Sequence, residues 1–232
     1  MTYPNVIALA SYKNAGKSES ANMLQYILNT PKFMHSYQLY KRVGTMFRGG
    51  KYKITSFAYP LKRTLAALLN INISRFEDRD FKENYYIYFP SLDITNKLPE
   101  NAVTVSDSKF ARLLSNKDFS FIQTSWITIR QLLQVFGTEC MRGIFGDKLW
   151  ILSTIKEDTN LIISDLRFKV ELEEVKKRRG KVIYIKRDSC IPGNHASEKE
   201  IQSMYENKMF NYVVDNNGTL KDLFDNLCNL KI

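Results

Sequence analysis

Near its start the sequence runs Val6-Ile7-Ala8-Leu9-Ala10 and then Ser11-Tyr12-Lys13-Asn14-Ala15-Gly16-Lys17-Ser18. The first five residues form a short apolar run, which is typical of a parallel strand buried on both faces. The next eight match the phosphate-binding loop pattern of glycine, four residues, glycine, lysine and serine or threonine, except that Ser11 replaces the first glycine. A helix is predicted next, because apolar residues recur at helical spacing from Met23 to Leu28. This strand, loop and helix predict a phosphate site in an α/β fold.

The chemistry of such a loop follows from its residue types. Backbone N–H groups and the helix N-terminus surround the phosphates, Lys17 neutralises their oxygens, and the Ser18 hydroxyl binds magnesium. A serine fits the first position if that position does not need positive φ. The alternative is a chance Gly-Lys-Ser in a surface turn, which the flanking strand and helix disfavour. The residues predicted to bind ATP here are Asn14, Ala15, Gly16, Lys17, Ser18 and Glu19.

The remaining apolar runs alternate between strand and helix patterns. Strands are predicted at 52–57, 161–163, 182–185 and 212–214, and helices at 61–69, 128–139, 149–155, 168–175 and 220–230. This alternation predicts a parallel β-sheet flanked by helices on both faces. Residues 83 to about 117 show few clean periods, and we interpret them as an insertion.

The 232 residues carry a formal net charge of +10. A basic protein can bind nucleic acid, but the same charge suits an enzyme whose substrates are phosphorylated. The basic residues are scattered, and the one dense run, at 176–179, ends a predicted helix, where cations complement the helix dipole. No nucleic-acid-binding module is recognisable, so we expect no specific nucleic-acid binding.

Cysteine usage and hydropathy point to a cytoplasmic protein without a membrane span. Cys140, Cys190 and Cys228 are odd in number and far apart, which fits neither a disulfide framework nor a zinc site. We expect reduced thiols in a cytosol-like compartment. No apolar stretch approaches the roughly 18 residues that a membrane-spanning helix needs.

Asp165 and Arg167 follow the strand predicted at 161–163. Open parallel sheets bind ligands at the carboxyl ends of their strands. Asp165 is therefore a candidate for holding magnesium or orienting the attacking phosphate, and Arg167 for neutralising transferred charge. Alternatively, Asp165 only caps the helix that begins near Phe168.

The helix predicted at 128–139 combines an apolar stripe with a polar face. Trp126, Ile129, Leu133 and Phe136 form the stripe. Arginine suits a phosphate and glutamine a base edge, so the polar face is a candidate nucleotide site, although such a face is often only solvated. Its residues are Arg130, Gln134 and Glu139, with Arg142 following.

Taken in order, these segments resemble those of the deoxynucleoside monophosphate kinases of viruses and phages, relatives of the nucleoside monophosphate kinases and dephospho-CoA kinase. The resemblance covers most of the chain. Tyr59, where aspartate is common, and Ser11 are the departures. The matching segments are 11–18, 57–62 (Phe-Ala-x-Pro-Leu-Lys), 76–79, 130–142, 163–168 with Glu171, 195–198 and 215–220. Ser197 and Glu200 alternatively form a helix capping box.

The resemblance implies ATP- and Mg²⁺-dependent conversion of a deoxynucleoside monophosphate to its diphosphate, in support of DNA precursor synthesis. It implies a P-loop nucleoside monophosphate kinase-like fold over residues 1–232. An acceptor-binding lobe is expected at about 60–145 and a small lid at about 187–205. A small-molecule substrate, a homodimer and a cytoplasmic location (the host cytoplasm for a viral protein) are compatible with it. Dephospho-CoA kinase and a nucleic-acid-binding P-loop protein remain the alternatives.

The same resemblance assigns roles to individual residues. The catalytic residues would be Lys17, Asp165, Arg167 and Arg187, and the metal ligands Ser18 and Asp165. Asn217 and Gly218 would lie near adenine. The acceptor site would be lined by Lys62, Arg130, Gln131, Gln134, Glu139 and Arg142.

Overall fold

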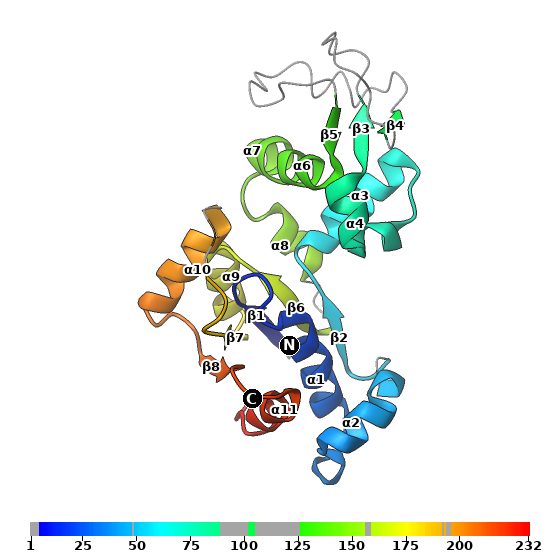
Figure 1. Cartoon of the computed structure of the whole chain (residues 1–232). Helices are drawn as coiled ribbons and strands as arrows, with labels where there is room; N and C mark the ends of the chain where they lie inside the picture. Colours follow the sequence, from blue (N-terminus) through cyan, green and yellow to red (C-terminus); the bar gives the residue numbers. More distant parts are fainter. Residues whose placement is uncertain are drawn as a thin grey trace. The chain divides into compact units, whose positions relative to one another are not determined.

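The computed structural model describes residues 5–47, 49–88, 102–104, 126–155, 159–191, 193 and 196–232. The chain forms two compact units, which are described separately (Figure 1). The first unit comprises Met1–Ala58 and Trp150–Ile232, and the second Tyr59–Leu149. In the described residues, no helix combines the length and apolarity needed to cross a membrane.

The first unit is built on a five-stranded sheet in which all paired strands are parallel, as predicted. The order across the sheet is β2-β6-β1-β7-β8, so β1 lies at its centre. The strands are β1 (Val6–Ala10), β2 (Tyr52–Thr55), β6 (Asn160–Leu166), β7 (Lys181–Lys186) and β8 (Tyr212–Asp215).

Helices cover both faces of this sheet. The side chains of β1 therefore alternate between two apolar cores. Val6, Ala8 and Ala10 face one core, and Ile7 and Leu9 face the other. The helices α8 (Leu149–Thr154), α9 (Lys169–Lys177) and α10 (Ala196–Glu206) contribute to the first core. The helices α1 (Lys17–Asn29), α2 (Tyr37–Val43) and α11 (Leu220–Cys228) contribute to the second, near the short 3₁₀ turns η1 (Lys32–Met34) and η2 (Gly44–Phe47).

The second unit, cyan to green in Figure 1, is mainly helical with a small mixed sheet of order β4-β3-β5. Its strands are β3 (Tyr86–Tyr88), β4 (Ala102–Thr104) and β5 (Trp126–Thr128). Its helical segments are α3 (Ala58–Leu69), η3 (Ile73–Glu77), α4 (Arg79–Asn84), α6 (Ile129–Gln134), η5 (Val135–Arg142) and α7 (Gly143–Phe145). Most of the insertion expected at 83 to about 117 lies outside the described residues.

The helix predicted at 128–139 begins as predicted, with Thr128 as the N-cap of α6, but its apolar stripe does not extend back to Trp126. Trp126 belongs to strand β5, which pairs with β3, so it is not part of a helical stripe. After Gln134 the α-helix continues as the π-helix η5. A β-carbon at Gly137 would approach Leu61 Cδ2 of α3 to 2.7 Å, so glycine permits the close packing of η5 on α3.

Candidate active site

The loop of residues 11–16 joins β1 to α1 and contains two left-handed residues. Asn14 has φ 66° and Gly16 has φ 93°. Ser11 is not among the non-glycine residues with positive φ. Its side chain is buried, and its hydroxyl donates to the carbonyl oxygen of Tyr12 at 2.8 Å. A serine therefore fits where the loop pattern has glycine, because this position does not need glycine's conformational freedom.

Lys17 begins α1 and turns back over the loop. Its Nζ donates to the carbonyl oxygen of Ser11 at 2.9 Å. Burial, followed by the positive charge of Arg167, lowers the pKa of Lys17 to about 8, although the carboxylates of Asp165, Glu198 and Glu171 oppose the shift. Lys17 and Arg167 are thus close enough to repel each other, and an anion bound beside them would relieve that repulsion.

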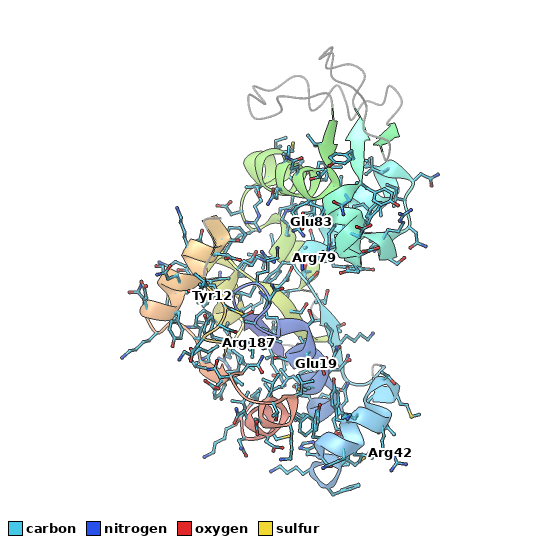
Figure 2. All side chains as sticks on the ribbon, in the orientation of Figure 1. Tyr12, Glu19, Arg42, Arg79, Glu83 and Arg187 are labelled. Carbon is cyan, nitrogen blue, oxygen red and sulfur yellow. The ribbon has the colours of Figure 1, made fainter. Side chains whose placement is uncertain are left out.

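The N-cap residue of α1 is Gly16, which has no side chain. No side-chain hydrogen bond therefore caps the N-terminus of this helix. The early N–H groups of such a helix and its dipole favour a bound anion. Ser18 is exposed in this first turn. Next to it, Glu19 accepts a hydrogen bond from the hydroxyl of Tyr40 at 2.8 Å (Figure 2 labels Tyr12 and Glu19 in this region).

Asn216 supports the same loop from the other end of the chain. Its Nδ2 donates to the carbonyl oxygen of Ala15 at 2.9 Å, and its side chain is buried. A β-carbon at Gly16 would lie 2.5 Å from that Nδ2. Sequence reasoning missed Asn216, since its neighbours Asn217 and Gly218 were the expected nucleotide contacts. The sequence around the Gly-Lys-Ser loop does not indicate that the loop binds a side-chain amide from a distant part of the chain.

Asp165 lies within β6, one residue before its end. Its Oδ1 accepts from the N–H of Phe57 at 2.7 Å and its Oδ2 from the N–H of Ala58 at 3.0 Å. It therefore caps the start of α3, and the alternative that it caps the helix near Phe168 is wrong. Glu171 caps that helix, because its Oε2 accepts from the N–H groups of Arg167 and Phe168.

The loop after β8 is tied to the end of β7 by Asn217. Its Oδ1 accepts from the N–H of Asp188, and its Nδ2 donates to carboxylate oxygens of Asp188 and Asp215. Arg187, beside Asp188, is exposed (Figure 2). Gly218 is close to Asp222, whose carboxylate a β-carbon at position 218 would meet at 2.6 Å. His195 lies outside the described residues.

In the second unit, two of the predicted acceptor residues form ion pairs. Lys62 Nζ binds Glu77 Oε1 at 2.9 Å, and Arg130 Nε binds Glu83 Oε1 at 2.7 Å. Glu83 lies on α4, as labelled in Figure 2.

The other predicted acceptor residues follow along α6 and η5. Gln131 belongs to the capping box of α6, in which its Oε1 accepts from the N–H of Thr128. Gln134 is exposed and Arg142 is half-buried. The side chain of Glu139 lies outside the described part of η5.

Comparison with models of protein families matches residues 5–227 to deoxynucleotide monophosphate kinase. The chain belongs to the deoxynucleotide monophosphate kinase family. The kinase is therefore a phosphotransferase that acts on deoxynucleoside monophosphates, as the resemblance implied. No curated protein matches its sequence. The match spans the kinase from β1 to α11, and so includes both the β1–α1 loop and the second unit.

Proposed function

We propose that the kinase transfers the γ-phosphoryl group of Mg-ATP to the 5′-phosphate of a deoxynucleoside monophosphate. The observation that carries this proposal is the loop between β1 and α1, where Lys17 Nζ donates to the Ser11 carbonyl at 2.9 Å and no side chain caps the first turn of α1. A helix N-terminus without a side-chain cap and the lysine beside it favour an anionic ligand, and the triphosphate of ATP is such a ligand.

In this proposal the β1–α1 loop binds the donor. The backbone of Asn14, Ala15 and Gly16 and the first turn of α1, which includes Glu19, surround the phosphates. Lys17 leaves the Ser11 carbonyl and neutralises phosphate oxygens, while Arg167 stabilises the charge that develops during transfer. Asn217 and Gly218 would border the adenine.

The residues proposed for magnesium fit a metal bound largely by phosphates and water. Ser18 presents an exposed hydroxyl, and each oxygen of Asp165 keeps a lone pair after accepting one backbone hydrogen bond. Ser18 and Asp165 would hold magnesium here, and the ion would supply positive charge to offset that of the phosphates. Arg187 would add a further cation from a lid at about 187–205.

The acceptor would bind to the lobe proposed at about 60–145, which falls in the second unit, Tyr59–Leu149. Lys62 and Arg130 are already paired with carboxylates, so both are held in place for a phosphate. Gln134, exposed on the same helical segment as Arg130, is proposed to contact the base, and Gln131, Glu139 and Arg142 are proposed to line the rest of the site.

The experiment is a substrate panel. ATP and Mg²⁺ are mixed with each deoxynucleoside monophosphate, the matching ribonucleotides and dephospho-CoA, and ADP release is followed. We expect turnover that requires both magnesium and a deoxynucleoside monophosphate. Turnover only with dephospho-CoA, or only in the presence of DNA or RNA, would contradict the proposal. The homodimer and the cytoplasmic location remain predictions.

A further inference from the structure

A third cation of the second unit, Lys82, lies with Lys62 and Arg130. Lys82 is on α4, is half-buried, and its Nζ donates to the carbonyl oxygen of Glu77 at 3.4 Å. The carboxylate of the same Glu77 accepts from Lys62 Nζ through both oxygens, at 2.9 and 3.0 Å. The two lysines therefore meet at one residue, one at its backbone and one at its side chain.

Arg130 joins this group through α4. Glu83, next to Lys82 in the sequence, accepts from Arg130 Nε at 2.7 Å. A guanidinium bound at Nε still has its two terminal nitrogens, which are the pair that grips a phosphate in a bidentate way. The α4 helix thus supplies both a cation and the carboxylate that orients Arg130.

The two other cations of this group act on Lys82. Burial lowers the pKa of Lys82, and the nearby Lys62 and Arg130 lower it further, while Glu77 and Glu83 act in the opposite direction. Within the described part of this unit, Lys62 and Lys82 both bind Glu77, and Arg130 binds Glu83. Like charges gathered around a partly buried group cost free energy, which an added anion would recover. The Lys62 side chain is only 14% exposed, whereas Glu77 is 64% exposed and can move away from it.

We propose that Lys82 binds the phosphate of the deoxynucleoside monophosphate together with Lys62 and Arg130. Glu77 and Glu83 hold the three cations apart in the free enzyme. When the acceptor arrives, its phosphate takes the place of the Glu77 carboxylate beside Lys62 and Lys82, and Glu83 keeps Arg130 in position. This inference rests on the proposed acceptor site, and it adds a residue to which neither the motifs nor the family match assigns a role.

The competing role for Lys82 is structural, through its hydrogen bond to the Glu77 carbonyl. Lys82→Gln separates the two roles, because glutamine can still donate to that carbonyl but carries no charge. Lys82→Arg restores the charge. Arg75→Gln is the matched control. It removes a cation from the same unit, and Arg75 stacks on the rings of Phe81 and Tyr85 at 4.5 and 4.9 Å.

The measurement is the Michaelis constant for the deoxynucleoside monophosphate and for ATP, together with binding of the monophosphate alone by calorimetry. In Lys82→Gln we expect the Michaelis constant and the dissociation constant for the monophosphate to rise about tenfold. The Michaelis constant for ATP should not change. Lys82→Arg should recover most of this loss. Arg75→Gln should lower the melting temperature and leave the monophosphate constant unchanged.

Three outcomes would overturn this inference, and they differ in what they say of the proposed acceptor site. If Lys82→Gln binds the monophosphate normally while Arg130→Ala does not, the role of Lys82 is overturned and the acceptor site stands. If Lys82→Gln lowers the melting temperature and binds the monophosphate normally, Lys82 has a structural role and the inference also fails. This holds whether or not Lys82→Arg has the same effect. If neither Lys82→Gln nor Arg130→Ala affects the monophosphate, the acceptor site itself is wrong and the inference falls with it.

Discussion

The side-chain amide of Asn216 donates to the carbonyl oxygen of Ala15 at 2.9 Å, across 201 residues of sequence. The backbone N–H of Asn216 also donates to the carbonyl of Lys186 at 2.8 Å, which fixes Asn216 at the end of β7. The β1–α1 loop is therefore held from outside by a residue of the loop that follows β8. The Ala15 N–H donates to the carbonyl oxygen of Tyr12 at 3.4 Å, so both backbone groups of Ala15 are hydrogen-bonded within the protein.

Replacing Asn216 should weaken the binding of ATP and leave the binding of the acceptor almost unchanged. In Asn216→Ala the Ala15 carbonyl loses its partner, and the loop is free to leave the conformation that binds phosphate. We expect the Michaelis constant for ATP to rise by roughly tenfold, about 1.4 kcal/mol, with a small change for the monophosphate. Asn216→Asp should be worse than Asn216→Ala, because a carboxylate would face the carbonyl oxygen. Steady-state kinetics with each substrate varied in turn decides this.

Asn211 provides the matched control for that experiment. Its Oδ1 accepts from the N–H of Val182 at 2.8 Å, so it is also a side-chain tie to β7, but at the opposite end of the strand. Asn211→Ala should lower the melting temperature without changing the Michaelis constant for ATP. If both alanine variants raise the Michaelis constant for ATP equally, the hydrogen bond from Asn216 has no special role at the loop.

Gly16→Ala should show a specific energetic coupling to Asn216. An alanine at position 16 suffers twice, from its φ of 93° and from a β-carbon 2.5 Å from the Asn216 amide. Asn216→Ala removes the second cost but not the first. The double variant should therefore be more stable than the sum of the two single effects predicts, by about 1 kcal/mol. Urea unfolding of the four proteins measures this coupling, and strict additivity would show that the clash is absorbed elsewhere.

Removing Lys17 should stabilise the free enzyme in a pH-dependent way. The folded pKa, about 8, lies below the ordinary value of 10.5. Below pH 8 the amine is protonated in both states, so the cost of burying its charge is fully present. Between 8 and 10.5 the unfolded state binds more protons, so the native state gains stability as the pH rises.

The variant Lys17→Met should therefore unfold at higher urea than the wild type at about pH 7. This advantage should shrink above pH 8 and disappear near 10.5. Phosphoryl transfer should fall by orders of magnitude in the same variant, because the charge on the phosphates is no longer neutralised. An advantage that is equal at neutral and alkaline pH would mean that packing, and not the buried charge, is responsible.

Asp165 should affect both stability and magnesium use. Asp165→Ala leaves the N–H groups of Phe57 and Ala58 without their acceptor, which should cost about 2 kcal/mol of unfolding free energy. Asp165→Asn keeps one acceptor oxygen and should recover part of this. If Asp165 also holds magnesium, the magnesium concentration for half-maximal activity should rise in Asp165→Asn. A lower melting temperature with an unchanged magnesium dependence would leave Asp165 only a capping role.

Apolar runs predicted the sheet because its strands are buried on both faces. Val6–Ala10 is a strand with the predicted bounds, and the runs at 161–163 and 182–185 lie within β6 and β7. Strand β6 is longer than predicted and includes Asp165, because pairing with β1 continues to Leu166. Periodicity detects the buried part of a strand and misses an end whose side chains are polar.

Long-range contacts could not be predicted from local patterns. The carboxylate of Asp165 accepts from residues 57 and 58, and the amide of Asn216 reaches residue 15, so neither role shows in the neighbouring sequence. The spacing of Trp126 to Ile129 and Leu133 predicts that it shares their apolar stripe. It pairs instead with Tyr88 in a sheet whose other strands come from earlier in the chain.

Arg130 separates an acceptor site from a solvated helix face. On a solvated face, Arg130→Ala would change stability by less than about 0.5 kcal/mol and leave activity intact. Its ion pair with Glu83 adds little to stability, because the two side chains are 39% and 36% exposed. If Arg130 binds the acceptor phosphate, the variant loses a bidentate, charge-assisted contact worth about 2–4 kcal/mol in the transition state.

That loss should appear as a lower kcat/KM for the monophosphate, with the Michaelis constant for ATP little changed. Arg130→Lys should recover only part of it, because an ammonium cannot reproduce the planar fork. Glu83→Gln should have a smaller effect of the same kind, since Arg130 then keeps its charge but loses the carboxylate that holds Nε. Normal monophosphate kinetics in Arg130→Ala would show that the acceptor does not bind at this helix. The proposed ATP site at Lys17 would still stand.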